Sequence, residues 1–140
     1  MSSYYYIACW VNFAVVLTYG LGLVVIPDWF LGKYIYKEGL WTNFTDREDR
    51  DSKNILRHLL IGLGLTWVSW ATLAYAFMAN CKDDDIKQAF AIVNVCIWVC
   101  WAFLDNTARC AWRLYAPLAN VLNFTLSTGM IGVWAVAIGA

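Results

Sequence analysis

Four long, nearly uncharged apolar stretches constrain this chain more than any other feature of its sequence. They cover roughly residues 4–27, 55–79, 88–104 and 115–139. A helix needs about 20 apolar residues to cross a hydrocarbon core of about 30 Å, so each stretch is predicted to span a membrane, although the third is short. We therefore expect an all-α fold, an integral membrane four-helix bundle made of two transmembrane hairpins. Residues 1–140 would form one domain with an inner loop over 28–54.

The composition agrees with a membrane protein. Hydrophobic residues make up 61% of the chain and charged residues 14%, whereas a soluble globular chain carries about 25% charged residues. The stretches also lack the polar face that a helix shows when one side lies in water. The formal net charge is zero, so no basic excess indicates binding to nucleic acid.

Basic residues are distributed unevenly between the two ends of the predicted bundle. Eight Lys and Arg residues lie in or beside the 28–54 and 105–114 connections, and two, Lys82 and Lys87, lie on the opposite side. The positive-inside rule then places the basic connections on the cytoplasmic, matrix or stromal side. Both termini are predicted on the less basic side, in an intermembrane space or a lumen.

The 28–54 connection is the one with room for extramembrane structure. Residues 29–39 are amphipathic enough to form a short helix along the membrane interface. Thr45, with Glu48 three residues later, has the pattern of a helix N-cap. The second long helix is therefore predicted to begin inside this loop.

Polar residues at the edges of the spans are the first place to look for a site. Arg57 and His58 open the second span at the depth where Asp105 closes the third, and Arg109 and Asn120 follow nearby. We expect these five residues to form a cluster at the inner rim. The cluster would be either a structural set of interfacial charges or a site for a lipid phosphate, a quinone head group or the magnesium of a chlorophyll.

Small and amide residues predict how the spans pack. Asn12 and Asn94 lie at a similar depth and are placed to hydrogen-bond across the first and third spans. Ala14, Thr18 and Gly22 lie four residues apart on the first span. Such a ridge of small residues lets helix backbones approach closely in lipid, so we expect it to contact another helix.

Tryptophan pairs mark the second and third spans. Trp67 and Trp70 lie three residues apart on one span, as do Trp98 and Trp101 on the next. The resulting flat faces suit acyl chains, a carotenoid, a helix of another protein or close packing within this one, and the sequence leaves these alternatives open.

Several chemistries are excluded by the residues themselves. The chain has a single histidine, so it does not supply two axial histidines to a haem or a multi-histidine metal site. No catalytic triad, glycine-rich phosphate loop or paired CxxC motif is present. No ionisable residue lies near the middle of a span, which argues against an ion-coupled transporter. We expect neither enzymatic activity nor a metal site.

One family resemblance covers the first half of the chain. It depends on Gly20-Leu-Gly22, Pro27 at the end of the first span, and Arg57 leading into Gly62-Leu-Gly64. This order resembles the DoxX-like small four-helix membrane proteins. The resemblance implies a four-helix membrane fold and a link to quinone-dependent redox steps, with Arg57 and Gly62 as the matched positions.

The absence of catalytic residues favours a structural role. We expect an accessory, or supernumerary, subunit of a large energy-transducing membrane complex that binds lipids and neighbouring subunits. If Met1 is the natural start, no targeting segment has been removed, which favours the mitochondrial inner membrane and the respiratory chain. Bound phospholipid is the expected non-protein component.

Two alternative functions remain. One is a subunit of a thylakoid photosystem that binds chlorophyll or carotenoid, and the other is a small quinone- or lipid-linked membrane enzyme.

Overall fold

The computed structural model describes residues 3–41 and 50–139, and within them the chain is almost entirely helical. The elements are α1 (Ser3–Val25), α2 (Pro27–Trp29), the π-helical turn η1 (Phe30–Ile35), α4 (Arg50–Asn80), α5 (Asp84–Cys110) and α6 (Pro117–Gly139). The predicted all-α class is confirmed. Four of the described helices are also long and apolar enough to cross a membrane, as expected for an integral multi-pass protein.

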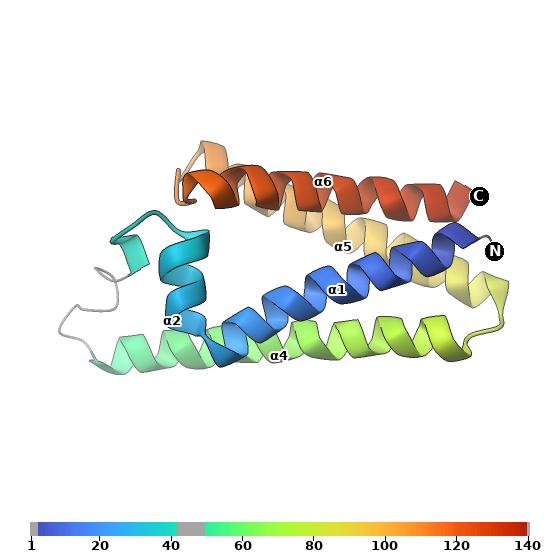
Figure 1. The fold of residues 1–140 in the computed structure, drawn as a ribbon, viewed down its shortest axis with the longest axis horizontal. Helices are drawn as coiled ribbons and strands as arrows, with labels where there is room; N and C mark the ends of the chain where they lie inside the picture. Colours follow the sequence, from blue (N-terminus) through green and yellow to red (C-terminus); the bar gives the residue numbers. More distant parts are fainter. Residues whose placement is uncertain (1–2, 42–49, 140) are drawn as a thin grey trace.

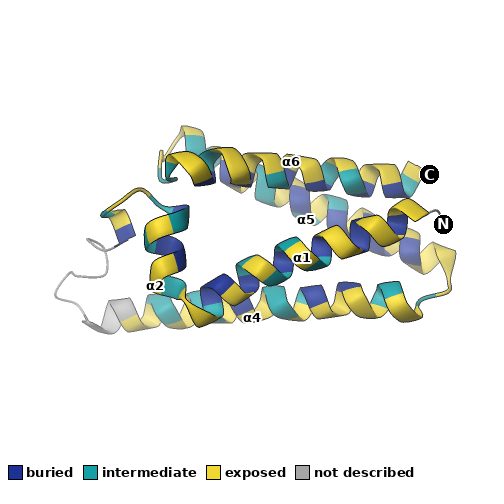
Figure 2. Cartoon of the chain, viewed as in Figure 1, coloured by how far each residue is buried: buried dark blue, intermediate teal, exposed yellow. Residues whose placement is uncertain are grey.

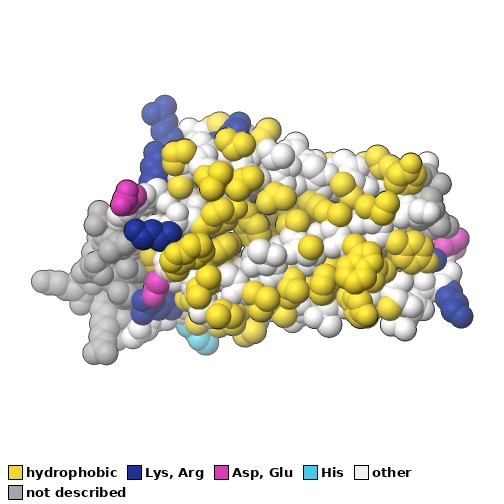
Figure 3. Space-filling view, in the orientation of Figure 1, with side chains coloured by type: hydrophobic (Ala, Val, Ile, Leu, Met, Phe, Trp, Pro, Cys, Tyr) yellow, Lys and Arg dark blue, Asp and Glu magenta, His cyan; other side chains and the backbone are white. Residues whose placement is uncertain are grey.

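The four long helices lie side by side. α1 packs along α4, α5 packs along α6, and α1 also contacts α6 (Figure 1). The two chain ends and the α4–α5 connection lie at one end of the molecule, whereas α2, η1 and the α5–α6 connection lie at the other. Hydrophobic side chains cover the middle of the surface and charged ones gather toward its two ends (Figure 3). This division matches the two faces of a membrane-spanning protein.

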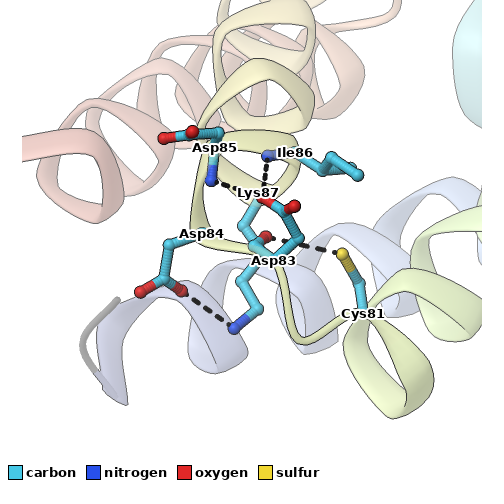
Figure 4. Close-up of polar contacts among 6 residues, drawn as sticks. All are labelled: Cys81, Asp83, Asp84, Asp85, Ile86 and Lys87. Carbon is cyan, nitrogen blue, oxygen red and sulfur yellow. Dashed lines mark hydrogen bonds and ion pairs between the residues drawn. The ribbon is translucent and has the colours of Figure 1, made fainter.

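Helix α5 is longer than the predicted span. It runs over Asp84–Cys110, whereas the apolar stretch covers only 88–104. Its start is set by Asp83, whose Oδ1 accepts hydrogen bonds from the backbone N–H groups of Asp85 and Ile86 at 2.9 and 3.1 Å (Figure 4). An aspartate in this position satisfies amide groups that the first helical turn leaves without partners. Hydropathy alone does not register such a cap, so the predicted span began too late.

The predicted inner loop contains helical structure at both of its ends. Helix α2 begins at Pro27 and η1 ends at Ile35, so the short helix expected over 29–39 forms slightly earlier. A proline suits the first position of a helix because its missing N–H would have no partner there. Helix α4 begins at Arg50, inside the predicted loop, as expected. The proposed cap at Thr45 lies outside the described residues.

Helices α1 and α4 approach most closely at a pair of glycines. A Cβ atom added to Gly20 would lie 2.9 Å from the carbonyl oxygen of Gly64, and one added to Gly64 would lie 2.8 Å from that of Gly20. The predicted ridge of small residues does not form this contact, because Ala14 and Thr18 are exposed. The Thr18 hydroxyl instead donates to the Ala14 carbonyl at 2.7 Å. Of the predicted ridge, Gly22 is buried against the ring of Phe30 in η1, while Gly20 makes the contact with α4.

Two buried amides connect the long helices. The Oδ1 atom of Asn12 accepts hydrogen bonds from the indole N–H groups of Trp98, at 2.9 Å, and Trp134, at 3.5 Å. The Oδ1 atom of Asn94 accepts one from Trp70 at 3.3 Å. Both asparagines are fully buried, and Figure 2 shows buried positions recurring along the long helices. They bond across helices as predicted, but each bonds to indoles and not to the other amide.

The tryptophan faces pack against each other between α4 and α5. The rings of Trp67 and Trp101 meet edge to face with their centroids 4.7 Å apart. Trp98 lies 6.5 Å from Trp67 in a similar arrangement, and Trp70 stacks on Phe90 at 5.7 Å. Of the alternatives left open by the sequence, close packing within the protein is the one that the structure contains.

Candidate functional site

A cavity lies among the long helices at the end where α2 and η1 are found. Its volume is about 130 Å³, and its wall takes residues from α1, η1, α4, α5 and α6 and from the segments that follow η1 and precede α6. A volume of this size suits a small molecule or one end of a longer one, since an apolar protein cavity of about 150 Å³ holds benzene. Most of the wall is aliphatic or aromatic, and its oxygen-bearing side chains are those of Tyr19, Tyr36, Asp105, Tyr115 and Asn123.

Backbone hydrogen bonds close one side of this cavity. Tyr36, just after η1, forms an isolated antiparallel bridge with Tyr115, which precedes α6. The backbone N–H of Ala116 donates to the carbonyl oxygen of Ile35 at 2.9 Å. These bonds join the η1 segment to the α5–α6 connection, and the rings of Tyr36 and Tyr115 lie 6.3 Å apart on the cavity wall.

An ion pair fastens the same segment to α4. The Nη2 and Nε atoms of Arg57 lie 2.5 and 3.3 Å from the two carboxylate oxygens of Asp28 in α2. The indole N–H of Trp41 donates to the same carboxylate at 3.1 Å. A guanidinium that meets both carboxylate oxygens fixes direction as well as distance. Helix α2 is therefore oriented across the ends of the long helices.

A chain of hydrogen bonds crosses the cavity from α1 to α6. The hydroxyl of Tyr19 donates to Oδ1 of Asn123 at 2.5 Å. The hydroxyls of Tyr19 and Tyr34 lie 3.2 Å apart. Because a phenol has a single hydrogen and that of Tyr19 is given to Asn123, Tyr34 is the donor in this second bond.

The carboxylate on the wall belongs to Asp105 in α5. This residue is 9% exposed, and its Oδ1 accepts a hydrogen bond from the Tyr115 hydroxyl at 2.7 Å. Burial, and then the bond to Asp105, raise the pKa of the Tyr115 phenol. Tyr115 therefore keeps its proton at neutral pH and acts as the donor.

The structure does not bring the five predicted cluster residues into contact as a group. Arg57 is engaged with Asp28, and His58 is exposed on α4. Within the described residues, no hydrogen bond or ion pair joins any two members of the predicted set. Similar depth in the membrane does not determine which way a side chain points around its helix, and depth was the only basis for the grouping.

The other members of the set also have separate surroundings. Arg109 follows Asp105 by four residues, a spacing that favours an ion pair on a helix. Its guanidinium instead lies over the ring of Phe124, 4.3 Å from the ring centroid. The Oδ1 atom of Asn120 is buried without a hydrogen-bond partner. Of the five, Asp105 is the one on the cavity wall.

Sequence reasoning did not identify Tyr19, Tyr34 or Asn123 as site residues. Tyr19 and Asn123 are 104 positions apart, and no short-range pattern relates them. One signal was present: Tyr19 lies inside an apolar span, whereas tyrosine usually marks the membrane interface. A phenol at that depth indicates a polar partner on a neighbouring helix.

No family model, curated protein or solved structure matches this chain. The chemistry of its own residues is therefore what supports a functional proposal.

Proposed function

We propose that this chain is a multi-pass membrane protein that binds a small, largely apolar molecule with a polar end in the cavity beside α2 and η1. The observation that carries the proposal is the composition of the cavity wall, where one carboxylate and several phenols lie among residues that are otherwise mostly aromatic and aliphatic.

We further infer that the helices form a bundle of two transmembrane hairpins, α1 with α4 and α5 with α6, with the cavity at the basic end.

Polar residues inside a membrane-spanning protein support this proposal. Such residues are costly in lipid and usually face a cavity or one another. Asp105, Tyr19 and Asn123 all line the cavity, and the hydrogen bonds from Tyr19 to Asn123 and from Tyr115 to Asp105 hold its polar end in a fixed shape before a molecule enters. Trp67 and Trp101 supply broad apolar surfaces for the remainder of the molecule.

Filling the cavity should weaken binding. Leu126 lines the cavity from α6, so Leu126→Phe adds a ring to the space that the ligand would occupy. The probes are a bromophenyl-butyl dimethylamine, its neutral hydrocarbon isostere and a brominated benzoquinone, because bromine quenches tryptophan emission on contact. In lipid nanodiscs at least one probe should quench saturably, and Leu126→Phe should weaken its binding by about tenfold, the result of about 1.4 kcal/mol of overpacking.

A matched variant separates binding from partition into lipid. Leu122 lies one helical turn before Leu126 on α6 and is 36% exposed, so Leu122→Phe makes the same change outside the cavity. It should leave the quenching curve unchanged. Quenching that is unsaturable for all three probes, or equally affected by both variants, rejects a ligand-binding cavity.

A second candidate function is the accessory subunit expected from the sequence. The observation that favours it is the outward face of α6, where Cβ atoms added to Gly129, Gly132 and Gly139 would meet nothing within 4 Å. In a bilayer, glycines on an open face allow a further helix to approach closely. This supports assembly with lipids and other subunits of an energy-transducing complex, in the mitochondrial inner membrane or, as the alternative, in a thylakoid. The DoxX-like resemblance would add a quinone-linked role, with Arg57 and Gly62 as matched positions.

Gly132→Leu tests the second candidate. Extracted from its own membranes in mild detergent, the wild-type protein should migrate with partner proteins on a native gel. Gly132→Leu should reduce that co-migration by about tenfold or more, since a branched side chain holds the partner backbone away. Gly62→Leu, at an open position on α4, is the control. Migration of the wild-type protein alone contradicts the accessory role.

A further inference from the structure

Asp105 is the charged residue of the cavity wall, and it has no cationic partner in the described part of the chain. The ion pairs there join Arg57 to Asp28 and Lys87 to Asp84. Arg109, at the favourable four-residue spacing, lies over the ring of Phe124 instead. The hydrogen bond that Asp105 accepts comes from the Tyr115 phenol, a neutral group. A buried carboxylate without a counter-charge is costly, and a cationic ligand would remove that cost.

We propose that the ligand of this cavity is a lipophilic amine, bound with its ammonium group against Asp105 and its apolar body against the tryptophans. This inference rests on the proposed ligand-binding function and names the chemical class that the cavity accepts. An ammonium N–H donates to a carboxylate in a charge-assisted hydrogen bond, one of the stronger contacts available to a small molecule.

Aromatic rings surround the same place. Trp101, Tyr36 and Tyr115 line the cavity together with Asp105. The faces of such rings attract an organic cation, and the attraction increases when water is excluded. A carboxylate combined with several rings therefore recognises an alkylated ammonium group by two independent means.

The existing hydrogen bonds also disfavour other head groups. Quinone carbonyls only accept hydrogen bonds, and they require donors on the wall. Of the three phenols on the wall, Tyr19 and Tyr115 already donate their hydrogens to Asn123 and Asp105, which leaves the Tyr36 hydroxyl as the phenol donor for a carbonyl. A phosphate would meet the Asp105 carboxylate as a like charge. Among the residues that the structure describes, the Asp105 carboxylate at the polar end of the cavity has no positively charged hydrogen-bond donor, and an ammonium group would supply one.

A neighbouring hollow extends the space for the apolar body. Its volume is about 190 Å³, and it shares Trp67, Trp98 and Trp101 with the cavity, while Thr66 and Ile97 belong to the hollow alone. The three shared indoles thus have apolar space on more than one side. An elongated amine would place its head at Asp105 and its tail along these rings.

The test compares the bromophenyl-butyl dimethylamine with the isostere in which a CH group replaces the nitrogen. At neutral pH the first is a cation and the second is neutral, and their shapes agree closely. In nanodiscs, the wild-type protein should bind the amine at least about tenfold more tightly, since coupling between close opposite charges exceeds about 1.4 kcal/mol. Asp105→Asn keeps the side-chain volume and the acceptor for Tyr115, and it should reduce this preference to about twofold or less.

The outcomes separate this inference from the proposed function. Equal binding of amine and isostere to the wild-type protein, weakened for both by Leu126→Phe, rejects the amine and keeps the cavity as a ligand site. A preference for the amine that survives in Asp105→Asn also overturns the inference, because the cation then binds elsewhere. Absence of saturable binding by any probe rejects both. The wild-type comparison needs no variant, so it decides the question even where Asp105→Asn fails to fold.

Discussion

Gly64→Val is expected to destabilise the folded protein severely. A Cβ atom at this position would lie 2.8 Å from both the carbonyl oxygen of Gly20 and a methyl carbon of Val24. Backbone cannot turn aside as a flexible side chain can, so α1 and α4 would have to separate. We expect the free energy of unfolding to fall by about 3 kcal/mol, the upper part of the range for overpacked cores. Unfolding in mixed detergent and SDS micelles, followed by circular dichroism, measures this loss.

Gly62→Val provides the matched control. Gly62 lies two residues earlier on the same helix, and a Cβ there would meet nothing within 4 Å. Both variants make the same change in helix propensity, so the difference between them isolates the contact with α1. Equal unfolding midpoints for the two variants would show that the α1–α4 packing described here is wrong.

Asn12→Leu is expected to have the second largest effect. The substitution retains approximate volume but removes the oxygen that accepts from Trp98 and Trp134. Two indole N–H groups would then be buried without an acceptor. An unsatisfied buried group costs about 1–3 kcal/mol in water-soluble proteins, and interhelical hydrogen bonds in membranes average about 0.6 kcal/mol. We expect a loss of about 2 kcal/mol in the same unfolding assay.

A double-mutant cycle tests the cause of that loss. In a Trp98→Phe background, Asn12→Leu should cost less, because one of the two donors is already absent. Asn80→Leu, at an exposed position near the end of α4, should change stability little. Strict additivity of Asn12→Leu and Trp98→Phe would contradict a hydrogen bond between these residues.

The four long helices were predictable because few backbone conformations are stable in the hydrocarbon core of a bilayer. Backbone groups in a hydrocarbon core must be satisfied within the segment, so a long apolar stretch becomes a helix. The helix ends were less predictable, since they depend on single polar residues. Asp83 shows this: its carboxylate starts α5 in a stretch that is not apolar.

The candidate site was predicted only in part. Asp105 was recognised as a polar residue at the right depth, but its partner Tyr115 was not identified as a site residue. Arg57 was grouped with Asp105, whereas it pairs with Asp28. That pairing depends on α2 folding back toward α4, a long-range event that spacing along one helix does not encode. The depth of each side chain in the membrane could be inferred from the sequence, but the direction in which it points around its helix could not.

The two attachments of the α2–η1 segment differ in how they respond to the solution. On the α4 side, the Arg57 and Asp28 side chains of the ion pair are 34% and 53% exposed, so dissolved salt screens their attraction. On the α6 side, the attachment consists of backbone hydrogen bonds such as that from Ala116 to Ile35, which salt affects little. Ionic strength therefore weakens the ion pair to α4, while the apolar contacts of Leu56 and Leu60 with this segment and the backbone bonds on the α6 side stay in place.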